Sequence, residues 1–366
     1  LAFLPAFLAR RDDILIMTER PSQEFLTQIQ NHGFSLPEIM ECKSSSNVWK
    51  PPAISRKISD IRPWAWTPES VSFFKNTFAS LTRKVNVDTL WNDGVRNLHS
   101  KSWSVEWGKH LASELVEDDW VAPEEVYGRP AKNLHELIAL RDHFNSLGYR
   151  NIVCKAPFGS AAHGNRCIMA DETIAPEMRT WLDEVWMEQD LIIVEPWLKR
   201  IYDYSVQFEK RAANMKALAF TRLVNNERGQ FRGIVVNGFC NGIDPDVTRF
   251  LLRRIKGRPR VYSWYEETIG PRLESELDTM DFSGPLGIDA FVYRDLSGRL
   301  KLKTMVELNP RFTMGRLGYE LGHHIAASSV GYFQIFTHSQ IRKSKTPGIV
   351  NFADELKRKH PVEQST

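Results

Sequence analysis

The sequence has few cysteines, little net charge and no long hydrophobic run. Its four cysteines, Cys42, Cys154, Cys167 and Cys240, lie far apart and form no C-x-x-C pair. This spacing predicts neither a zinc site nor a disulfide framework, and we expect a reduced, cytoplasmic environment. A net charge of +3 over 366 residues is too small to indicate a nucleic-acid or membrane partner.

No apolar stretch of the sequence is long enough to span a bilayer. Residues 1–9 are apolar, but the basic residues Arg10 and Arg11 follow them, whereas a signal peptide carries its basic residues in front. Because the first residue is Leu1 and not methionine, we expect the numbering to start inside a longer gene product.

The residues that are abundant indicate a folded chain. Hydrophobic residues make up 42% of the sequence and charged residues 25%, with 11 Trp and 20 Phe, which indicates a substantial core and excludes disorder. A chain of 366 residues is expected to form two or three domains.

Periodicity predicts an α+β chain. A small α/β unit comes first, with a strand at 13–17, a helix at 22–32 and a second strand at 34–40. We expect further helices at 69–83, 103–115, 134–147, 177–187 and 246–254, within 264–281, and from about 315, the last ordered helix. Further extended segments are expected at 121–126, 152–156, 166–169, 191–195, 203–208, 216–224, 231–237, 287–293 and 300–308.

Polar side chains alternate at the end of the last predicted strand, at Glu307, Asn309 and Arg311. Alternate residues of a strand face the same side. Oxygen ligands from Glu307, Asn309 and Asp289, which lies on the partner strand, suit magnesium. Arg311 can hold phosphate oxygens and offset charge in a transition state. The alternative interpretation is a solvated strand face with a surface ion pair, which so short a motif favours when taken alone.

Two lysines are placed to meet phosphate groups. Lys155 ends a predicted strand and precedes a loop with Gly159, Ser160 and Gly164, where glycine lets backbone N–H groups approach an anion. Lys101 follows Ser100 at a predicted helix start, where the helix N-terminus attracts anions. The alternative interpretation is an ordinary hairpin loop and two solvated lysines.

A third feature can frame a purine. The buried strand 191–195 ends in Glu195, and Leu198 follows shortly after. Backbone groups can meet the edge of a base while apolar side chains cover its faces. Asp203 is close enough in sequence to reach a ribose hydroxyl. The alternative is a core strand that ends in a turn, followed by a capping aspartate.

The order of these features resembles the ATP-grasp superfamily over about Lys101 to Gly318. The resemblance is carried by Lys155-Ala-Pro-Phe-Gly-Ser, Val194-Glu-Pro-Trp-Leu and Glu307-Leu-Asn-Pro-Arg. It implies an ATP-grasp fold, in which two subdomains clamp ATP, behind a small α/β domain. The implied boundaries are 1–98 for the N-terminal domain, 99–200 for the central nucleotide-clamping region, 201–345 for the metal-binding subdomain and 346–366 for a C-terminal tail.

The resemblance also implies roles for individual residues. Lys101 and Lys155 would contact phosphates beneath a loop formed by Gly159, Ser160 and Gly164. Glu195 and Leu198 would bracket the adenine, with Asp203 near the ribose. Asp289, Glu307 and Asn309 would hold two Mg²⁺ ions, with Mn²⁺ as an alternative, and Arg311 would stabilise the phosphoryl group in transfer.

The implied activity is an ATP-dependent ligase that joins a small-molecule carboxylate, such as an amino acid or peptide, to an amine through an acylphosphate. Arg222 and Arg316 are candidates for binding the substrate carboxylate, with surface charge as the alternative. Two other functions stay open: a nucleotide-binding regulator that does not ligate, and a small-molecule kinase. A homodimer is an open alternative for the assembly.

Overall fold

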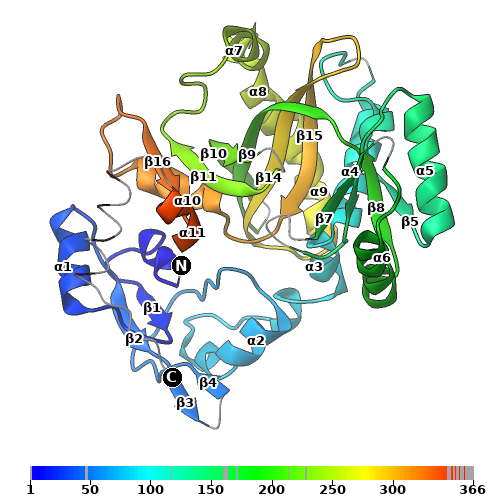
Figure 1. The fold of residues 1–366 in the computed structure, drawn as a ribbon. Helices are drawn as coiled ribbons and strands as arrows, with labels where there is room; N and C mark the ends of the chain where they lie inside the picture. The colour runs from blue at the N-terminus through cyan, green and yellow to red at the C-terminus, as the bar shows by residue number, and fades with distance from the viewer. Residues whose placement is uncertain are drawn as a thin grey trace.

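The computed structural model describes residues 2–45, 48–116, 118–159, 164–169, 172–212, 214–226 and 229–343, and the single residues 348, 351, 354 and 358. Figure 1 shows three parts: a small N-terminal unit, a large central sheet, and a smaller sheet covered by helices. Among the described residues, no helix combines the length and the apolar character that crossing a membrane requires.

The N-terminal unit pairs two short parallel strands, β1 (Ile14–Met17) and β2 (Glu38–Glu41), across helix α1 (Gln23–Asn31). Ser22 caps α1, since its side chain accepts a hydrogen bond from the Phe25 N–H at 3.2 Å. The remaining elements up to residue 98 are short: η1 (Leu4–Phe7), β3 (Lys43–Ser45), β4 (Val48–Lys50), α2 (Pro68–Phe74), η2 (Thr77–Ser80), η3 (Val87–Thr89) and α3 (Asp93–Leu98).

The smaller sheet has four antiparallel strands in the order β5-β8-β6-β7. Its strands are β5 (Arg129–Ala131), β6 (Ile152–Lys155), β7 (Asn165–Ile168) and β8 (Ile192–Pro196). Helices α5 (Leu134–Ser146) and α6 (Pro176–Gln189) cover one face, burying Phe144 and Leu182 against Ile192. This packing supports the ends of β6 and β8, where Lys155 and Glu195 lie.

The central sheet has six strands in the order β15-β14-β9-β10-β11-β16, all antiparallel. They are β9 (Lys199–Arg211), β10 (Asn214–Asn225), β11 (Phe231–Val236), β14 (Gly284–Arg294), β15 (Leu300–Asn309) and β16 (Gly331–Gln334). Helix α4 (Lys101–Glu114) packs against β15, where the Leu308 N–H donates to Ser104 Oγ at 2.9 Å.

Successive side chains of β9 point to opposite faces of the central sheet. Tyr204, Val206 and Phe208 enter the main core, against the helices that follow β11. The residues between them are polar, and Asp203 and Ser205 line a cavity on the other face. The core helices and their hairpin are α7 (Pro245–Leu252), β12 (Arg254–Ile255), β13 (Arg258–Pro259), α8 (Arg260–Ser263), η5 (Trp264–Ile269, a π-helix) and α9 (Gly270–Thr279).

Several predicted elements differ from the observed ones. The helix predicted at 69–83 ends at Phe74, and the strand predicted at 34–40 begins only at Glu38. Within 121–126, Val121 forms one bridge to β15, but Glu124–Val126 is the 3-10 helix η4. Helix α10 (Met314–Gly322) is not the last ordered element, because β16 and α11 (His338–Lys343) follow it.

Candidate functional site

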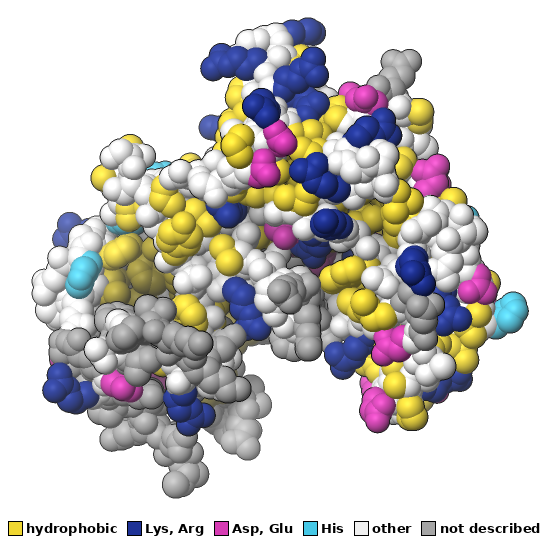
Figure 2. Space-filling model, turned by 45° about the horizontal axis from the view of Figure 1, so that its top comes forward, with side chains coloured by type: hydrophobic (Ala, Val, Ile, Leu, Met, Phe, Trp, Pro, Cys, Tyr) yellow, Lys and Arg dark blue, Asp and Glu magenta, His cyan; other side chains and the backbone are white. Residues whose placement is uncertain are grey.

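A cavity of about 660 Å³ lies between the two sheets and the N-terminal unit. Figure 2 shows a hollow in this face with acidic and basic side chains inside it. The charged residues that line the cavity come from α4, both sheets and the segment after β15: Lys101, Lys155, Glu195, Arg200, Asp203, Asp289, Glu307 and Arg311. Elements from both sheets therefore supply one continuous site.

Two carboxylates face each other across the centre of the cavity. Asp289 on β14 and Glu307 on β15 are direct cross-strand partners. Side chains opposite each other on an antiparallel pair lie close together, and like charges there destabilise a sheet. Burial and the neighbouring Glu307 charge raise the pKa of Asp289 to about 6. Such a pair is stabilised by a cation between the two carboxylates.

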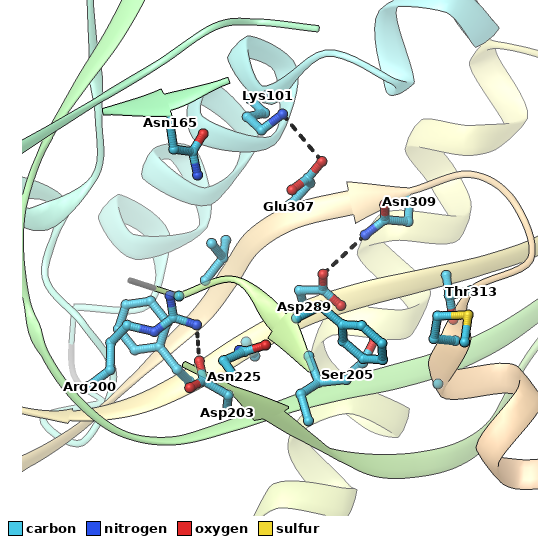
Figure 3. Close-up of a pocket in the computed structure, with 18 of the residues that line it drawn as sticks. Lys101, Asn165, Arg200, Asp203, Ser205, Asn225, Asp289, Glu307, Asn309 and Thr313 are labelled. Atoms are coloured by element: carbon cyan, nitrogen blue, oxygen red, sulfur yellow. Dashed lines mark hydrogen bonds and ion pairs between the residues drawn. The ribbon is translucent and has the colours of Figure 1, made fainter. Parts of the chain in front are cut away.

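The groups around this pair complete a possible cation site. Asn309 Nδ2 donates to Asp289 Oδ2 at 3.2 Å, and Asn309 Oδ1 accepts from Arg311 Nη2 at 2.8 Å. Lys101 Nζ lies 3.5 Å from Glu307 Oε1 and donates to the Gly159 carbonyl at 2.7 Å. Figure 3 shows Lys101 and Asn309 reaching toward Glu307 and Asp289 from different elements.

The donor set is chemically suited to magnesium, which prefers carboxylate and carbonyl oxygens and keeps sites for phosphate and water. In the described part of the chain, no group of three or more His, Cys, Asp or Glu side chains is placed to hold a metal. The set here has two carboxylates, whereas the Asn309 amide directs its Nδ2 to Asp289 and its Oδ1 to Arg311, so phosphate oxygens and water would have to complete the coordination.

A buried cluster of opposite charge lies at the other sheet. Glu195 Oε2 lies 2.9 Å from Lys155 Nζ and 2.8 Å from Lys303 Nζ. Burial by itself raises the pKa of a carboxyl, but the two ammonium groups outweigh it and hold the pKa of Glu195 at about 2. Burial lowers the pKa of Lys303 to about 8. One carboxylate and two ammonium groups leave a positive charge in excess, which favours an anion in the cavity.

Two further features of this end suit a nucleoside. Glu195 Oε1 is buried and has no hydrogen-bond partner in the described part of the chain. Asp203 pairs with Arg200, whose guanidinium lies 4.8 Å from the centroid of the Phe291 ring. Leu198 and Phe291 line the same region and offer apolar faces.

The structure brings together most of the residues that the sequence singles out. Those that line the cavity are Lys101, Lys155, Glu195, Leu198, Asp203, Asp289, Glu307, Asn309 and Arg311. Gly159 and Gly164 lie at the two ends of the predicted glycine loop and do not line it, although Gly159 contacts Lys101 through its carbonyl. Ser160 lies outside the described residues.

The two candidate substrate arginines lie elsewhere. Arg222 does not line the cavity, and its Nη1 donates to the Asn241 carbonyl at 2.9 Å on the core side of the sheet, near the Tyr202 ring. Arg316 on α10 is already paired with Glu209 at 2.9 Å and Glu320 at 2.8 Å. Neither arginine is placed to bind a substrate carboxylate in this cavity.

Sequence reasoning missed Arg200 and Lys303. Residues three apart on a regular strand face opposite sides, so Arg200 and Asp203 were not expected to meet. The pairing of β14 with β9 shifts register between Val292 and Tyr293, and Ile201 is skipped in this pairing. The shift brings Arg200 and Asp203 to the same face of β9. Lys303 lies opposite Phe291, and its ammonium is buried against Glu195. The sequence signal that could have identified Lys303 is its position four residues before Glu307 on the same strand.

No family model and no curated protein matches the sequence. Solved structures match in three dimensions. One is D-alanyl-alanine synthetase A from Vibrio cholerae, with 11% identity and a TM-score of 0.45, over 84% of this chain and 91% of that chain. Another is an N5-carboxyaminoimidazole synthetase from Staphylococcus aureus complexed with ADP, with 12% identity and a TM-score of 0.40, over 83% and 58%.

A third is the biotin carboxylase domain of Hydrogenobacter thermophilus 2-oxoglutarate carboxylase, in complex with MgADP, ADP and bicarbonate. It is 15% identical with a TM-score of 0.40, over 60% of this chain and 41% of that chain. This chain spans about half the length of the biotin carboxylase domain chain and of the N5-carboxyaminoimidazole synthetase chain.

Proposed function

We propose that this chain is an ATP- and Mg²⁺-dependent ligase of the ATP-grasp type, which activates a carboxylate as an acylphosphate for attack by an amine. The observation that carries the proposal is the facing pair Asp289 and Glu307, of which Asp289 is joined by hydrogen bonds through Asn309 to Arg311. An acidic pair beside a fixed guanidinium suits phosphoryl transfer, which needs charge neutralisation more than a protein nucleophile.

The buried lysines support a nucleotide in the same cavity. Lys155 and Lys303 leave a positive charge in excess beside Glu195, and Lys101 lies next to the acidic pair. ATP bound with its phosphates beside these lysines would neutralise the positive cluster, and its Mg²⁺ would neutralise the acidic pair. Asp203 lies where a ribose hydroxyl could donate to it, and Leu198 and Phe291 offer apolar faces to the adenine.

The proposed reaction has two steps. An oxygen of the substrate carboxylate attacks the γ-phosphorus of ATP, the bond to the β–γ bridging oxygen breaks, and ADP leaves. The amine nitrogen then attacks the acyl carbon, phosphate leaves with the C–O electron pair, and the nitrogen loses a proton. Asp289, Glu307 and Asn309 would hold Mg²⁺, which supplies Lewis-acid charge neutralisation when bound. Arg311 stabilises the negative charge of the phosphoryl oxygens.

The test is ADP release from MgATP with a carboxylate panel, with hydroxylamine as a general amine nucleophile. A ligase releases ADP and phosphate and forms a hydroxamate only when carboxylate and hydroxylamine are both present. A stable phosphorylated product without free phosphate would indicate a kinase instead. Tight MgATP binding without ADP release under any of these conditions would indicate a regulatory module.

Replacing Glu307 tests the site itself. Glu307→Gln keeps the shape of the side chain but removes one charge of the acidic pair, so we expect ADP release to fall by roughly 100-fold or more. Circular dichroism should show an unchanged fold, because Glu307 is 25% exposed and lies in no core cluster. The control is Glu177→Gln, at an exposed position of α6. Full activity of Glu307→Gln would contradict the metal assignment.

A further inference from the structure

Lys303 is a charged residue beside the cavity that does not line it. It lies on β15 opposite Phe291, and its side chain is 1% exposed. Its ammonium group donates to Glu195 Oε2 at 2.8 Å and to the Val126 carbonyl at 3.1 Å. The centroid of the Tyr127 ring lies 5.0 Å from the same nitrogen. Groups of the protein therefore surround this ammonium, and it has no direct access to a ligand in the cavity.

The same oxygen of Glu195 also meets a second lysine, which does line the cavity. Lys155 Nζ lies 2.9 Å from Glu195 Oε2. The three charged side chains are each at most 9% exposed, so solvent screens their charges little. One carboxylate balances one ammonium group, which leaves the charge of the other ammonium in excess.

Glu195 is held by packing as well as by charge. Gly128 lies against it, since a Cβ at position 128 would stand 2.7 Å from Glu195 Cγ. Glu195 belongs to β8 of the smaller sheet and Lys303 to β15 of the central sheet, so their contact also joins the two sheets. Lys303 therefore has two separable roles: it is a counter-ion of Glu195 and a structural link between the sheets.

The charge that Lys155 presents to the cavity depends on the counter-ion role. Although burial lowers the pKa of Lys303 to about 8, its ammonium group is still charged at pH 7. Without that charge, Lys155 would be the single counter-ion of the Glu195 carboxylate, and the pair would be neutral. A neutral pair attracts phosphate less than a free ammonium group does, because the carboxylate repels phosphate oxygens.

We propose that Lys303 is a positioning residue for the nucleotide: it neutralises Glu195 and thereby leaves the charge of Lys155 for the phosphates. This inference rests on the proposed function, because it takes Lys155 as a phosphate contact. Lys155 can then exchange Glu195 for a phosphate oxygen when the nucleotide binds, while Lys303 keeps the buried carboxylate paired. A buried carboxylate left without any partner would be strongly destabilising.

A double-mutant cycle tests this role through binding of MgADP, measured by isothermal titration at pH 7. Lys303→Met removes the ammonium group and keeps an apolar side chain in the buried site. We expect it to bind MgADP roughly tenfold or more weakly than the unmodified protein, because Lys155 is then neutralised by Glu195. Adding Glu195→Gln removes the carboxylate charge and frees Lys155 again. We expect this double variant to bind within about threefold of the unmodified protein.

The matched control is Lys301→Met, on the same strand. Lys301 does not line the cavity, and its ammonium group donates to the Asp119 carbonyl and not to Glu195. The control removes the same charge from β15 without changing the balance at Glu195, so MgADP affinity should stay within about threefold. A loss as large as that of Lys303→Met would indicate a general effect of net charge and would overturn the inference.

The two roles of Lys303 predict different results for the double variant. Equal losses in Lys303→Met and in the double variant would identify Lys303 as a structural link, because Glu195→Gln restores no contact that methionine lacks. If Lys303→Met does not fold by circular dichroism, Glu195→Gln is compared with the double variant instead. Their affinities should agree within about threefold, and a tenfold difference would overturn the inference.

The remaining outcomes separate the inference from the function on which it rests. Binding of MgADP by Lys303→Met as tight as by the unmodified protein would overturn the inference and leave the ligase proposal standing. If the unmodified protein does not bind MgADP or MgATP, the ligase proposal fails, and the inference fails with it.

Discussion

At the scale of single residues, the cavity is organised by charges that are partly neutralised within the protein and partly left for a ligand. Glu195 is shared by two lysines, and Asp289 faces Glu307 across two strands. The first cluster has a positive charge in excess, and the second holds two carboxylates side by side, with Lys101 next to Glu307. A triphosphate together with its metal ion would compensate the charges of both clusters. We therefore do not interpret either cluster as a simple structural ion pair.

Lys155 gives a direct test of the positive cluster. Lys155→Ala removes one ammonium group that faces the proposed phosphates, while Glu195 keeps Lys303 as a partner, so the fold should persist. Loss of a hydrogen bond to a charged group predicts roughly tenfold to 100-fold weaker MgATP binding by titration calorimetry. Lys199→Ala, at an exposed position of β9 outside the cavity, is the control. An unchanged dissociation constant for Lys155→Ala would rule out its phosphate role.

Glu195 gives a pH test. The folded-state pKa of about 2 lies below the ordinary value of 4.5. A lowered carboxyl pKa contributes stability that is fully present above pH 4.5 and is lost as the pH falls through 4.5 toward 2, on the order of 3 kcal/mol. The difference in unfolding free energy between the unmodified protein and Glu195→Gln should therefore shrink over this window in urea titrations.

The control for this pH test is Glu177→Gln, because Glu177 is exposed on α6 and has no such cluster around it. Its stability difference from the unmodified protein should stay small and constant with pH. A difference for Glu195→Gln that is equally flat from pH 7 to pH 2 would show that Glu195 is not held ionised by Lys155 and Lys303.

At the scale of elements, irregular strands and a tight turn place the side chains. The register shift at Ile201 lets Arg200 and Asp203 share one face, and a second shift in the pairing of β14 with β15 puts Lys303 opposite Phe291. The turn between β10 and β11 closes over this end, since Gly229 approaches Arg200 and Trp197. Regular strands would have pointed these groups away from each other.

Gly229 allows a matched test of this turn. Its φ of +72° strains any other residue, and a Cβ at this position would lie 2.7 Å from Arg200 Nη1. Gly229→Ala should cost about 1 kcal/mol of stability and, by displacing Arg200 from Asp203, should weaken MgATP binding severalfold. Gly298→Ala, at φ +84° with nothing within 4 Å, carries the same strain without the contact.

These two glycine variants should therefore lose similar stability in urea unfolding, and only Gly229→Ala should lose nucleotide affinity by calorimetry. Equal MgATP affinity in both variants would show that the β10–β11 turn does not help to form the nucleotide site. A change of affinity in Gly298→Ala would point instead to a general effect of backbone strain.

At the scale of the whole molecule, one cavity joins three parts of the chain. Its lining comes from the small sheet, the central sheet and the N-terminal unit. Binding to the native state alone stabilises a protein by mass action, by about 2.7 kcal/mol at a ligand concentration 100 times the dissociation constant. We expect MgATP at that concentration to raise the unfolding free energy by about this amount.

Removing the metal should reverse this effect. With EDTA present, ATP loses the ion that links it to Asp289 and Glu307, so most of the stabilisation should disappear in chemical unfolding curves. AMP, which lacks the β- and γ-phosphates, is the control and should stabilise weakly with or without Mg²⁺. Stabilisation by ATP that does not depend on Mg²⁺ would contradict the proposed site.

The sequence alone determined much of the site, because local patterns carry that information. Alternation along a strand placed Glu307 and Asn309 together, and the observed contacts from Asn309 to Asp289 and Arg311 agree with it. The strand ends at Lys155 and near Glu195 and the helix start at Lys101 were also predicted correctly. These features depend on neighbours within a few residues, so the printed order of the chain is sufficient to find them.

The tertiary structure alone decided the rest. Strand irregularities such as the bulge at Ile201 are set by pairing with a distant strand, so Arg200 could not be placed from the sequence. Likewise Arg222 and Arg316 are polar residues like many others until the fold turns one to the core side and pairs the other with Glu209. The cavity is lined by Leu4, Trp64 and Ile335, and only long-range packing brings side chains so far apart in sequence to one cavity.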